Sequence, residues 1–140
     1  MADKFIGLQY PLQKTSRGLL AQKKGVDTIK ADILQLLLTV PGERVMLPDF
    51  GTPLNRLIFE PNDPLLKETA KNMIINSINK WEPRVIISNI DVSIPTLDDL
   101  NPTDSGDELE SILKITIKFI DPDNISEVNE LKLTVPLGGA

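Results

Sequence analysis

Apolar residues along this chain follow two periods, helical in the first part and alternating in the second. Helical spacing predicts a first helix over about Asp27–Leu38, with Asp27 as its N-terminal cap. A second helix is predicted to begin with Asp63 as cap and Pro64 as first residue, and to end before Pro83. The apolar sides comprise Ile29, Ile33, Leu36, Leu37 and Val40 in the first helix, and Leu66, Ala70, Met73, Ile74, Ile78 and Trp81 in the second.

Beyond Arg84 the apolar residues alternate with polar ones, which is typical of strands with one buried face. The inward residues are Ile86, Ile90, Val92 and Ile94 (with Ser88 as an exception), then Leu113, Ile115, Ile117 and Phe119, then Leu131, Leu133 and Val135. Three such strands predict an antiparallel sheet that the two long helices cover on one face. The fold class is therefore α+β, as a single domain over residues 1–140.

The remaining segments are predicted to be mostly irregular. Residues 1–17 are expected to form an irregular N-terminal arm, followed by a short strand at Gly18–Lys23. An extended piece is expected at Glu43–Leu47 and one or two helical turns at Pro53–Phe59. The segment Asp98–Glu110 contains six acidic residues and no basic one, and its Pro, Gly and Ser content favours a solvated loop over a calcium site.

The residue inventory excludes several kinds of chemistry. The chain has no cysteine and no histidine, so thiolate or histidine metal sites and Ser-His-Asp catalysis are excluded, and no metal or cofactor is expected. A net charge of -5 argues against binding to nucleic-acid phosphates. No apolar run approaches the roughly 18 residues of a membrane span, and the N-terminus lacks a signal-peptide core, so we expect no membrane contact and a cytoplasmic origin.

Charge is distributed unevenly along the chain. Residues 1–30 hold six basic and two acidic residues, a local charge of +4, so the remainder carries -9. This basic segment is either an arm that docks on an acidic partner or an ordinary solvated face.

Catalysis by carboxylates is the enzymatic alternative. Glu43, Glu60 and Glu82 are the candidates for a glycoside hydrolase, which needs two carboxyl groups that face each other across a sugar. Nothing in the sequence pairs them, and aromatic residues that stack on sugars make up only 4% of the chain. We therefore predict that the protein is not an enzyme and has no catalytic residues.

Two features favour an interaction protein instead. Glu82 and Arg84 flank Pro83 at the boundary between helix and strand, and the proline makes a rigid corner of them. The corner serves either as an internal brace or as a partner contact, since arginine forks serve both uses. The second feature is the last strand, where Leu131, Leu133 and Val135 point inward and Lys132 and Thr134 outward, so that its free edge could accept another chain's strand.

Two motifs together resemble the baseplate wedge family of contractile phage tails. One is Pro41-Gly42-Glu43-Arg44 with Asp49-Phe50-Gly51, and the other is Trp81-Glu82-Pro83-Arg84. The family includes the sheath-initiating wedge protein and relatives in pyocins, type VI secretion and extracellular contractile injection systems. The resemblance covers roughly residues 15–136, and the acidic loop is longer than the family leads us to expect.

The resemblance implies a fold similar to the interlocking domain of the tail sheath. It also implies that Glu82, Pro83 and Arg84 contact the helical core bundle formed by other wedge proteins. Residues Leu131–Val135 would exchange strands with the tail sheath protein, and hub proteins near the tube are further partners. The implied location is the baseplate of a virion or injection machine, assembled in the bacterial cytoplasm. The alternatives are an unrelated α+β interaction module and a lysozyme-like cell-wall hydrolase.

Overall fold

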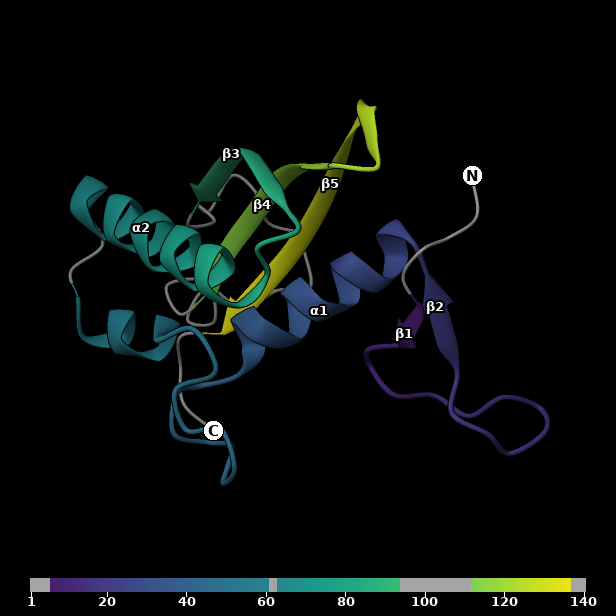
Figure 1. Cartoon of the computed structure of the whole chain (residues 1–140). Coiled ribbons are helices and arrows are strands. Elements are labelled where there is room, and N and C mark those ends of the chain that lie inside the picture. The colour runs from purple at the N-terminus through teal and green to yellow at the C-terminus, as the bar shows by residue number, and fades with distance from the viewer. Residues whose placement is uncertain (1–5, 61–62, 94–111, 137–140) are drawn as a thin grey trace, which may run out of the picture.

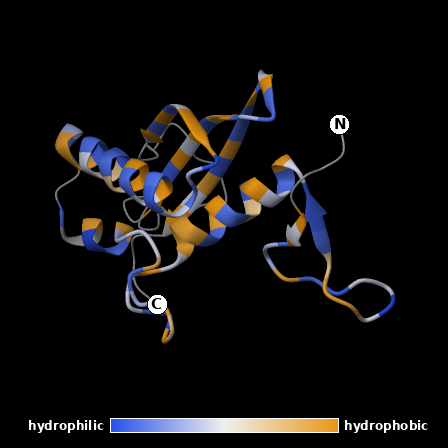
Figure 2. Ribbon diagram, in the orientation of Figure 1, coloured by the Kyte–Doolittle hydropathy of each residue, from blue (hydrophilic) through white to orange (hydrophobic). Residues whose placement is uncertain are grey.

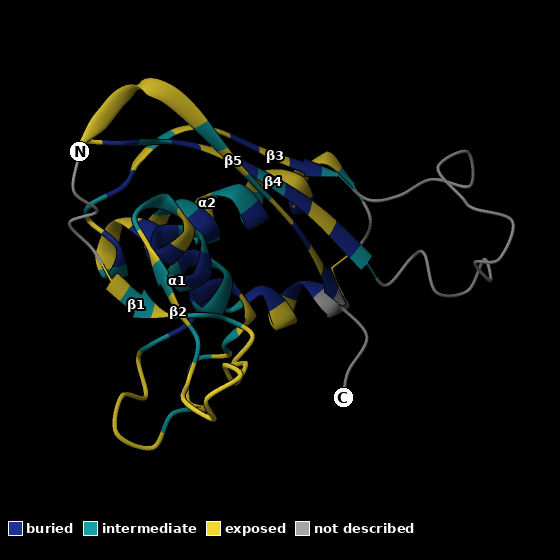
Figure 3. Ribbon diagram, turned by 90° about the vertical axis from the view of Figure 1, so that its right-hand side faces the viewer, coloured by how far each residue is buried: buried dark blue, intermediate teal, exposed yellow. Residues whose placement is uncertain are grey.

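Two helices lie on one side of a three-stranded antiparallel sheet (Figures 1 and 3). The structure, a computed structural model, describes residues 6–60, 63–93 and 112–136. Its elements are β1 (Ile6–Leu8), β2 (Gln22–Lys24), α1 (Val26–Leu38), the 3-10 helix η1 (Leu54–Phe59), α2 (Pro64–Trp81), β3 (Ile86–Ser93), β4 (Ile112–Asp121) and β5 (Asn124–Pro136). The predicted α+β class is confirmed. Both long helices precede the strands of the large sheet as predicted, but two short strands, β1 and β2, come before α1.

The large sheet has the strand order β3-β4-β5, which places β4 in the centre. Ile115 of β4 lies opposite Leu133 of β5, and Ile117 lies opposite Ile90 of β3. The predicted alternation in β4 is confirmed, because Leu113, Ile115, Ile117 and Phe119 are at most 1% exposed. These side chains and the apolar sides of both helices form one buried cluster. Figure 2 shows hydrophobic and hydrophilic residues alternating along the strands of the large sheet.

A β-bulge in β3 corrects the predicted phase of that strand. Ile87 pairs with Phe119 and Asn89 with Lys118, so Ser88 is an extra residue on the β3 side. An extra residue shifts the two-residue period and moves side chains to the other face. Ile86, predicted to be buried, is therefore 54% exposed, whereas Ile90 and Val92 face the core as predicted. Ile94 lies outside the described residues.

The start and end of α2 follow the sequence signals. Asp63 caps the helix, because its Oδ1 accepts a hydrogen bond from the Leu66 N–H over 3.0 Å, and Pro64 is the first helical residue. Pro83 follows two residues after the last helical residue, Trp81. The stripe of Leu66, Ala70, Ile74 and Ile78 is buried, while Met73 and Trp81 are half-buried and pack against the core.

The N-terminal cap of α1 was predicted wrongly. The cap is Gly25, with φ of 58°, and Asp27 lies inside the first turn without a side-chain capping bond. Glycine takes this left-handed conformation at no steric cost, so the chain turns directly from β2 into the helix. Val40 was also placed wrongly on the apolar stripe: it lies beyond Leu38, the last helical residue, and is 38% exposed.

The N-terminal segment contains a small hairpin that the sequence did not predict. β1 and β2 pair antiparallel, so residues 1–17 are not wholly irregular, and the expected strand at Gly18–Lys23 begins later, at Gln22. The hairpin lies beyond the N-terminal end of α1 and away from the large sheet (Figure 1). Thr28 of α1 joins it, because Thr28 Oγ1 donates a hydrogen bond to the Lys23 carbonyl over 2.7 Å.

Three other predicted segments have different outcomes. The expected helical turns form η1, whereas Glu43–Leu47 is irregular with a bend at Val45 and Met46 instead of an extended piece. The last strand is longer than predicted and begins at Asn124. The acidic loop Asp98–Glu110 lies outside the described residues. Within the described part of the chain, no helix has the length and hydropathy needed to cross a membrane.

Candidate functional site

The corner formed by Glu82, Pro83 and Arg84 follows directly from the way α2 ends. The Glu82 N–H still donates to the Ile78 carbonyl over 2.7 Å, as in the helix, but its φ and ψ of -129° and 66° leave the helical region. A residue that precedes proline is pushed out of that region by contact with the ring. The chain turns, and the Val85 N–H donates back to the Glu82 carbonyl over 3.2 Å before β3 begins.

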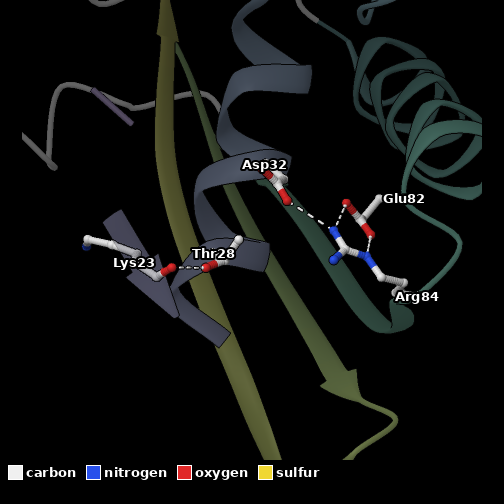
Figure 4. Close-up of polar contacts among 5 residues, drawn as sticks. All are labelled: Lys23, Thr28, Asp32, Glu82 and Arg84. Atoms are coloured by element: carbon white, nitrogen blue, oxygen red, sulfur yellow. Dashed lines mark hydrogen bonds and ion pairs between the residues drawn. The ribbon is translucent and has the colours of Figure 1, made fainter. Parts of the chain in front are cut away.

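The Arg84 side chain makes an internal brace with two carboxylates (Figure 4). Its Nε and Nη2 donate to the two oxygens of Glu82, the second over 2.6 Å, and Nη2 also donates to Asp32 Oδ2 over 3.0 Å. Side-chain exposure is 8% for Glu82, 32% for Arg84 and 39% for Asp32. The buried Glu82 carboxylate therefore has a fork-shaped partner, while Asp32 connects the corner to α1 at the rim.

Burial and pairing shift two of the ionisation equilibria in this brace. Partial burial raises the pKa of the Asp32 carboxyl, and the hydrogen bond from Arg84 offsets only part of that rise. The neighbouring Glu82 carboxylate raises the Asp32 pKa further. The hydrogen bond to Glu82 raises the pKa of Arg84, so the guanidinium keeps its charge.

The loop between α1 and η1 is held by hydrogen bonds to its own backbone. The Gly42 N–H donates to the Pro48 carbonyl over 2.7 Å, and Glu43 Oε2 accepts from the Val40 N–H over 3.0 Å. Where the loop returns, the Thr52 N–H donates to the Thr39 carbonyl over 3.0 Å. Gly51 makes this return possible: its φ is 127°, and an added Cβ would lie 2.4 Å from the Thr39 carbonyl oxygen.

Aromatic contacts join this loop to the corner. The Phe50 and Trp81 rings meet edge to face with centroids 5.3 Å apart. The Arg44 guanidinium carbon lies 4.1 Å from the Phe50 centroid, and Lys80 Nζ lies 4.9 Å from the Trp81 centroid. The two sequence motifs therefore converge on one hollow of about 190 Å³, lined by Asp32, Gln35, Leu36, Arg44, Phe50, Trp81 and Glu82.

The second predicted interaction element lies elsewhere on the sheet. Leu133 and Val135 are buried and Leu131 is half-buried, whereas Lys132 and Thr134 are exposed, as predicted. β5 is an edge strand, because β4 is its neighbour in the strand order and nothing described pairs with its other side. Ile86, beside the corner, is in register with Ile120 of β4, whereas Leu131–Val135 pairs with Ile117–Leu113. The structure thus separates the corner and the strand edge along the sheet.

Asp32 is the site residue that sequence reasoning missed. It lies three residues after Ile29 and four before Leu36, which places it at the edge of the buried side of α1. A carboxylate at such a position usually needs a partner, and this is the signal that could have identified it. Its partner comes from a turn 52 residues away, which helical periodicity alone does not reveal.

Comparison with known proteins identifies the class of protein that has this fold and these motifs. Residues 23–120 match the sequence model of a family of baseplate wedge proteins. The chain belongs to that family, described as Baseplate wedge protein gp25, and it is a baseplate wedge component of a contractile tail system. The predicted resemblance is confirmed.

One sequence relative agrees with this assignment, and two solved structures share the fold. The chain is 28% identical over 114 residues to the baseplate wedge protein gp25 of Enterobacteria phage T4, covering 81% of this chain and 77% of the relative. A proposed tail lysozyme from Geobacter sulfurreducens has the same fold, with a TM-score of 0.66, 23% identity and coverage of 82% of this chain and 93% of the other. A chain in the anti-feeding prophage baseplate has a TM-score of 0.60 and 18% identity, over 96% of this chain and 86% of the other.

Proposed function

We propose that the corner of Glu82, Pro83 and Arg84 attaches this chain to the helical core bundle formed by other wedge proteins. The observation that carries the proposal is the convergence of both motifs on one partly open hollow. The hydrogen bonds described for Arg84 are made within the chain, so the role of Arg84 is to hold the shape of the surface that the partner contacts. Pro83 is exposed, and Arg84 and Asp32 keep about a third of their side-chain surface accessible.

Incorporation into baseplates tests this attachment. Arg84→Ala is expected to abolish incorporation, and Arg56→Ala, which removes an exposed arginine of η1, is the matched control and should incorporate normally. Because Arg84 also stabilises the fold, circular dichroism must show that the variant is folded at the assembly temperature. Normal incorporation of folded Arg84→Ala protein would refute the proposed contact.

The exposed edge of β5 is the second part of the proposed function. It would receive a strand from the first ring of tail sheath subunits, with Leu131, Lys132, Leu133, Thr134 and Val135 forming the template. This proposal is supported by the position of β5 at the edge of the sheet, while its inward side chains are packed in the core. Main-chain hydrogen bonds to an added strand would fix the register of the ring.

Hub proteins near the tube are further proposed partners, and assembly would take place in the bacterial cytoplasm.

Sheath polymerisation on assembled baseplates tests the template. Thr134→Pro removes a backbone donor and breaks strand geometry, so full-length sheaths should fail to form. Thr134→Val keeps both the backbone donor and a β-branched side chain, and it should support normal sheaths. Full-length sheaths on folded Thr134→Pro protein would show that this strand is not the template.

We infer that the chain acts without catalysis, although one protein of similar fold is named as a tail lysozyme. That likeness, at 23% identity, concerns the fold alone. Two of the three candidate acids are engaged within the chain, since Glu82 binds Arg84 and Glu43 accepts from the Val40 N–H. A turbidity assay on peptidoglycan should show no clearing, and clearing that is lost in Glu82→Gln would overturn this inference.

A further inference from the structure

The loop after α1 exposes a group of large apolar side chains that the corner and the strand edge do not explain. Val45 is 93% exposed and Met46 is 92% exposed, and we call this pair the apolar tip. Three flanking residues, Leu38, Val40 and Leu47, are each about 40% exposed. Single exposed apolar residues are common on protein surfaces, but a group of this kind indicates an interaction site.

The loop presents this tip in a defined conformation, and the two charged side chains immediately before it make contacts within the chain. The hydrogen bond from Gly42 to Pro48 closes the base of the loop. Glu43 is bound to the Val40 backbone, and Arg44 lies over the Phe50 ring. The tip therefore offers a partner two apolar side chains at little cost in loop ordering. A surface that complements it is concave and apolar, and it needs no opposite charge.

The loop is also continuous with the corner. Arg44, immediately before the tip, stacks on Phe50, and Phe50 contacts Trp81, the residue before Glu82. Arg44 and Glu82 both line the same hollow. A partner seated on the corner is thus adjacent to the tip. Two side chains are too few for a stable interface by themselves, since each partner in a specific complex commonly buries about 800 Å².

We propose that Val45 and Met46 insert into an apolar hollow on the same wedge protein that contacts the corner, and that they act as anchors of that interface. This inference rests on the proposed attachment of the corner. In many interfaces a few buried side chains supply most of the binding energy, while the surrounding contacts exclude water. The corner then positions the partner, and the tip supplies the apolar burial.

Substitution of the tip tests its contribution to affinity. Val45→Ser/Met46→Ser should weaken binding to the purified core-bundle wedge proteins by about 10- to 100-fold, with the melting temperature unchanged. Leu65→Ser is the matched control, because Leu65 is 68% exposed on α2, and it should bind with the wild-type Kd. Wild-type affinity of the double variant would overturn the proposal.

Oxidation of methionine locates the contact directly. Hydrogen peroxide should oxidise Met46 in the free chain and spare it in assembled baseplates, whereas the half-buried Met73 of α2 should react equally in both. If the chain is incorporated but Met46 stays reactive, the anchor is wrong and the attachment stands. If the chain is absent from baseplates, both fail. Protection of Met46 that grows with the concentration of the free chain would mean that a second copy covers the tip, and it would also overturn the proposal.

Discussion

Arg84 donates a hydrogen bond from Nη2 to Asp32 Oδ2 over 3.0 Å, and this bond joins the turn after α2 to α1. The same guanidinium binds both oxygens of Glu82, whose side chain is 8% exposed. The surface proposed for the partner and the packing of the two helices therefore depend on one side chain. Variants of Arg84 will change stability and assembly together, so the two effects must be measured separately.

Arg84→Ala should destabilise the isolated chain. The substitution leaves the buried Glu82 carboxylate without its fork, and breaking a fully buried pair costs about 3–5 kcal/mol. Because Arg84 is 32% exposed, we expect a smaller loss of unfolding free energy, about 1–3 kcal/mol. Urea unfolding measures it. Lys132→Ala breaks an ion pair with Glu130 in which the side chains are 72% and 43% exposed, and it should cost no more than about 0.5 kcal/mol. Equal losses in the two variants would contradict a structural role for the brace.

Asp32 should make the chain less stable, relative to Asp32→Asn, as the pH rises above the ordinary aspartate pKa of 3.8. Burial raises the Asp32 pKa in the folded state, so between 3.8 and that raised value the folded chain binds more protons than the unfolded one. The Asp32 contribution is therefore greatest below 3.8 and is lost as the pH rises through the folded pKa.

The measurement is the difference in unfolding free energy between wild type and Asp32→Asn from pH 3.5 to 7, in which the contributions of other acids largely cancel. The unfolding free energy of the wild type should fall steadily relative to that of Asp32→Asn across the lower part of this range, and the difference should then stay constant. A wild type that instead gains stability with rising pH would mean that the bond from Arg84 outweighs burial and lowers the Asp32 pKa.

Local signals in the sequence were sufficient wherever one element determined its own boundaries. α2 has a capping Asp63, Pro64 in its first turn and Pro83 after its end, and all three act within a few residues. The alternation in β4 was equally informative, because the buried face of this strand appears in its own sequence as apolar residues at every second position. The corner was predicted for the same reason, since the effect of proline on its neighbours is local.

Features that depend on another part of the chain were not predictable in this way. The bulge at Ser88 is defined by pairing with β4, so the sequence showed only an exception to the alternation. The cap of α1 depends on the direction in which the chain leaves β2 and enters Gly25. The choice between brace and partner contact stayed open because Asp32 lies on another helix. The exposure of Val45 and Met46 was hidden within a segment interpreted as extended.

Gly51→Ala should destabilise the chain more than Gly42→Ala. Both glycines have positive φ, of 127° and 93°, so alanine at either position introduces strain of about 1–3 kcal/mol. At Gly42 an added Cβ meets nothing within 4 Å, whereas at Gly51 it would lie 2.4 Å from the Thr39 carbonyl oxygen. The Gly51 variant should therefore lose at least about 3 kcal/mol in urea unfolding, because the hydrogen bond from the Thr52 N–H to the Thr39 carbonyl is broken as well. Equal losses would mean that the backbone around Thr39 and Gly51 can relax around the added methyl group.

Thr28→Val should release the β1–β2 hairpin while the core stays intact. Valine keeps the shape of the threonine side chain but leaves the Lys23 carbonyl without its donor, now 2.7 Å away, at a cost of about 1–2 kcal/mol. The hairpin lies away from the large sheet (Figure 1), so this loss should appear as local opening. Amide exchange at Gln9 and Ala21, which are bonded within the hairpin, should accelerate about five- to thirtyfold, whereas the Ile117 amide in β4 should not change.

Thr39→Val is the matched control, because it removes the hydroxyl bonded to the Gln35 carbonyl at the other end of α1 and should leave hairpin exchange unaltered. Equal acceleration at all three amides would show that the hairpin and the core unfold as one unit.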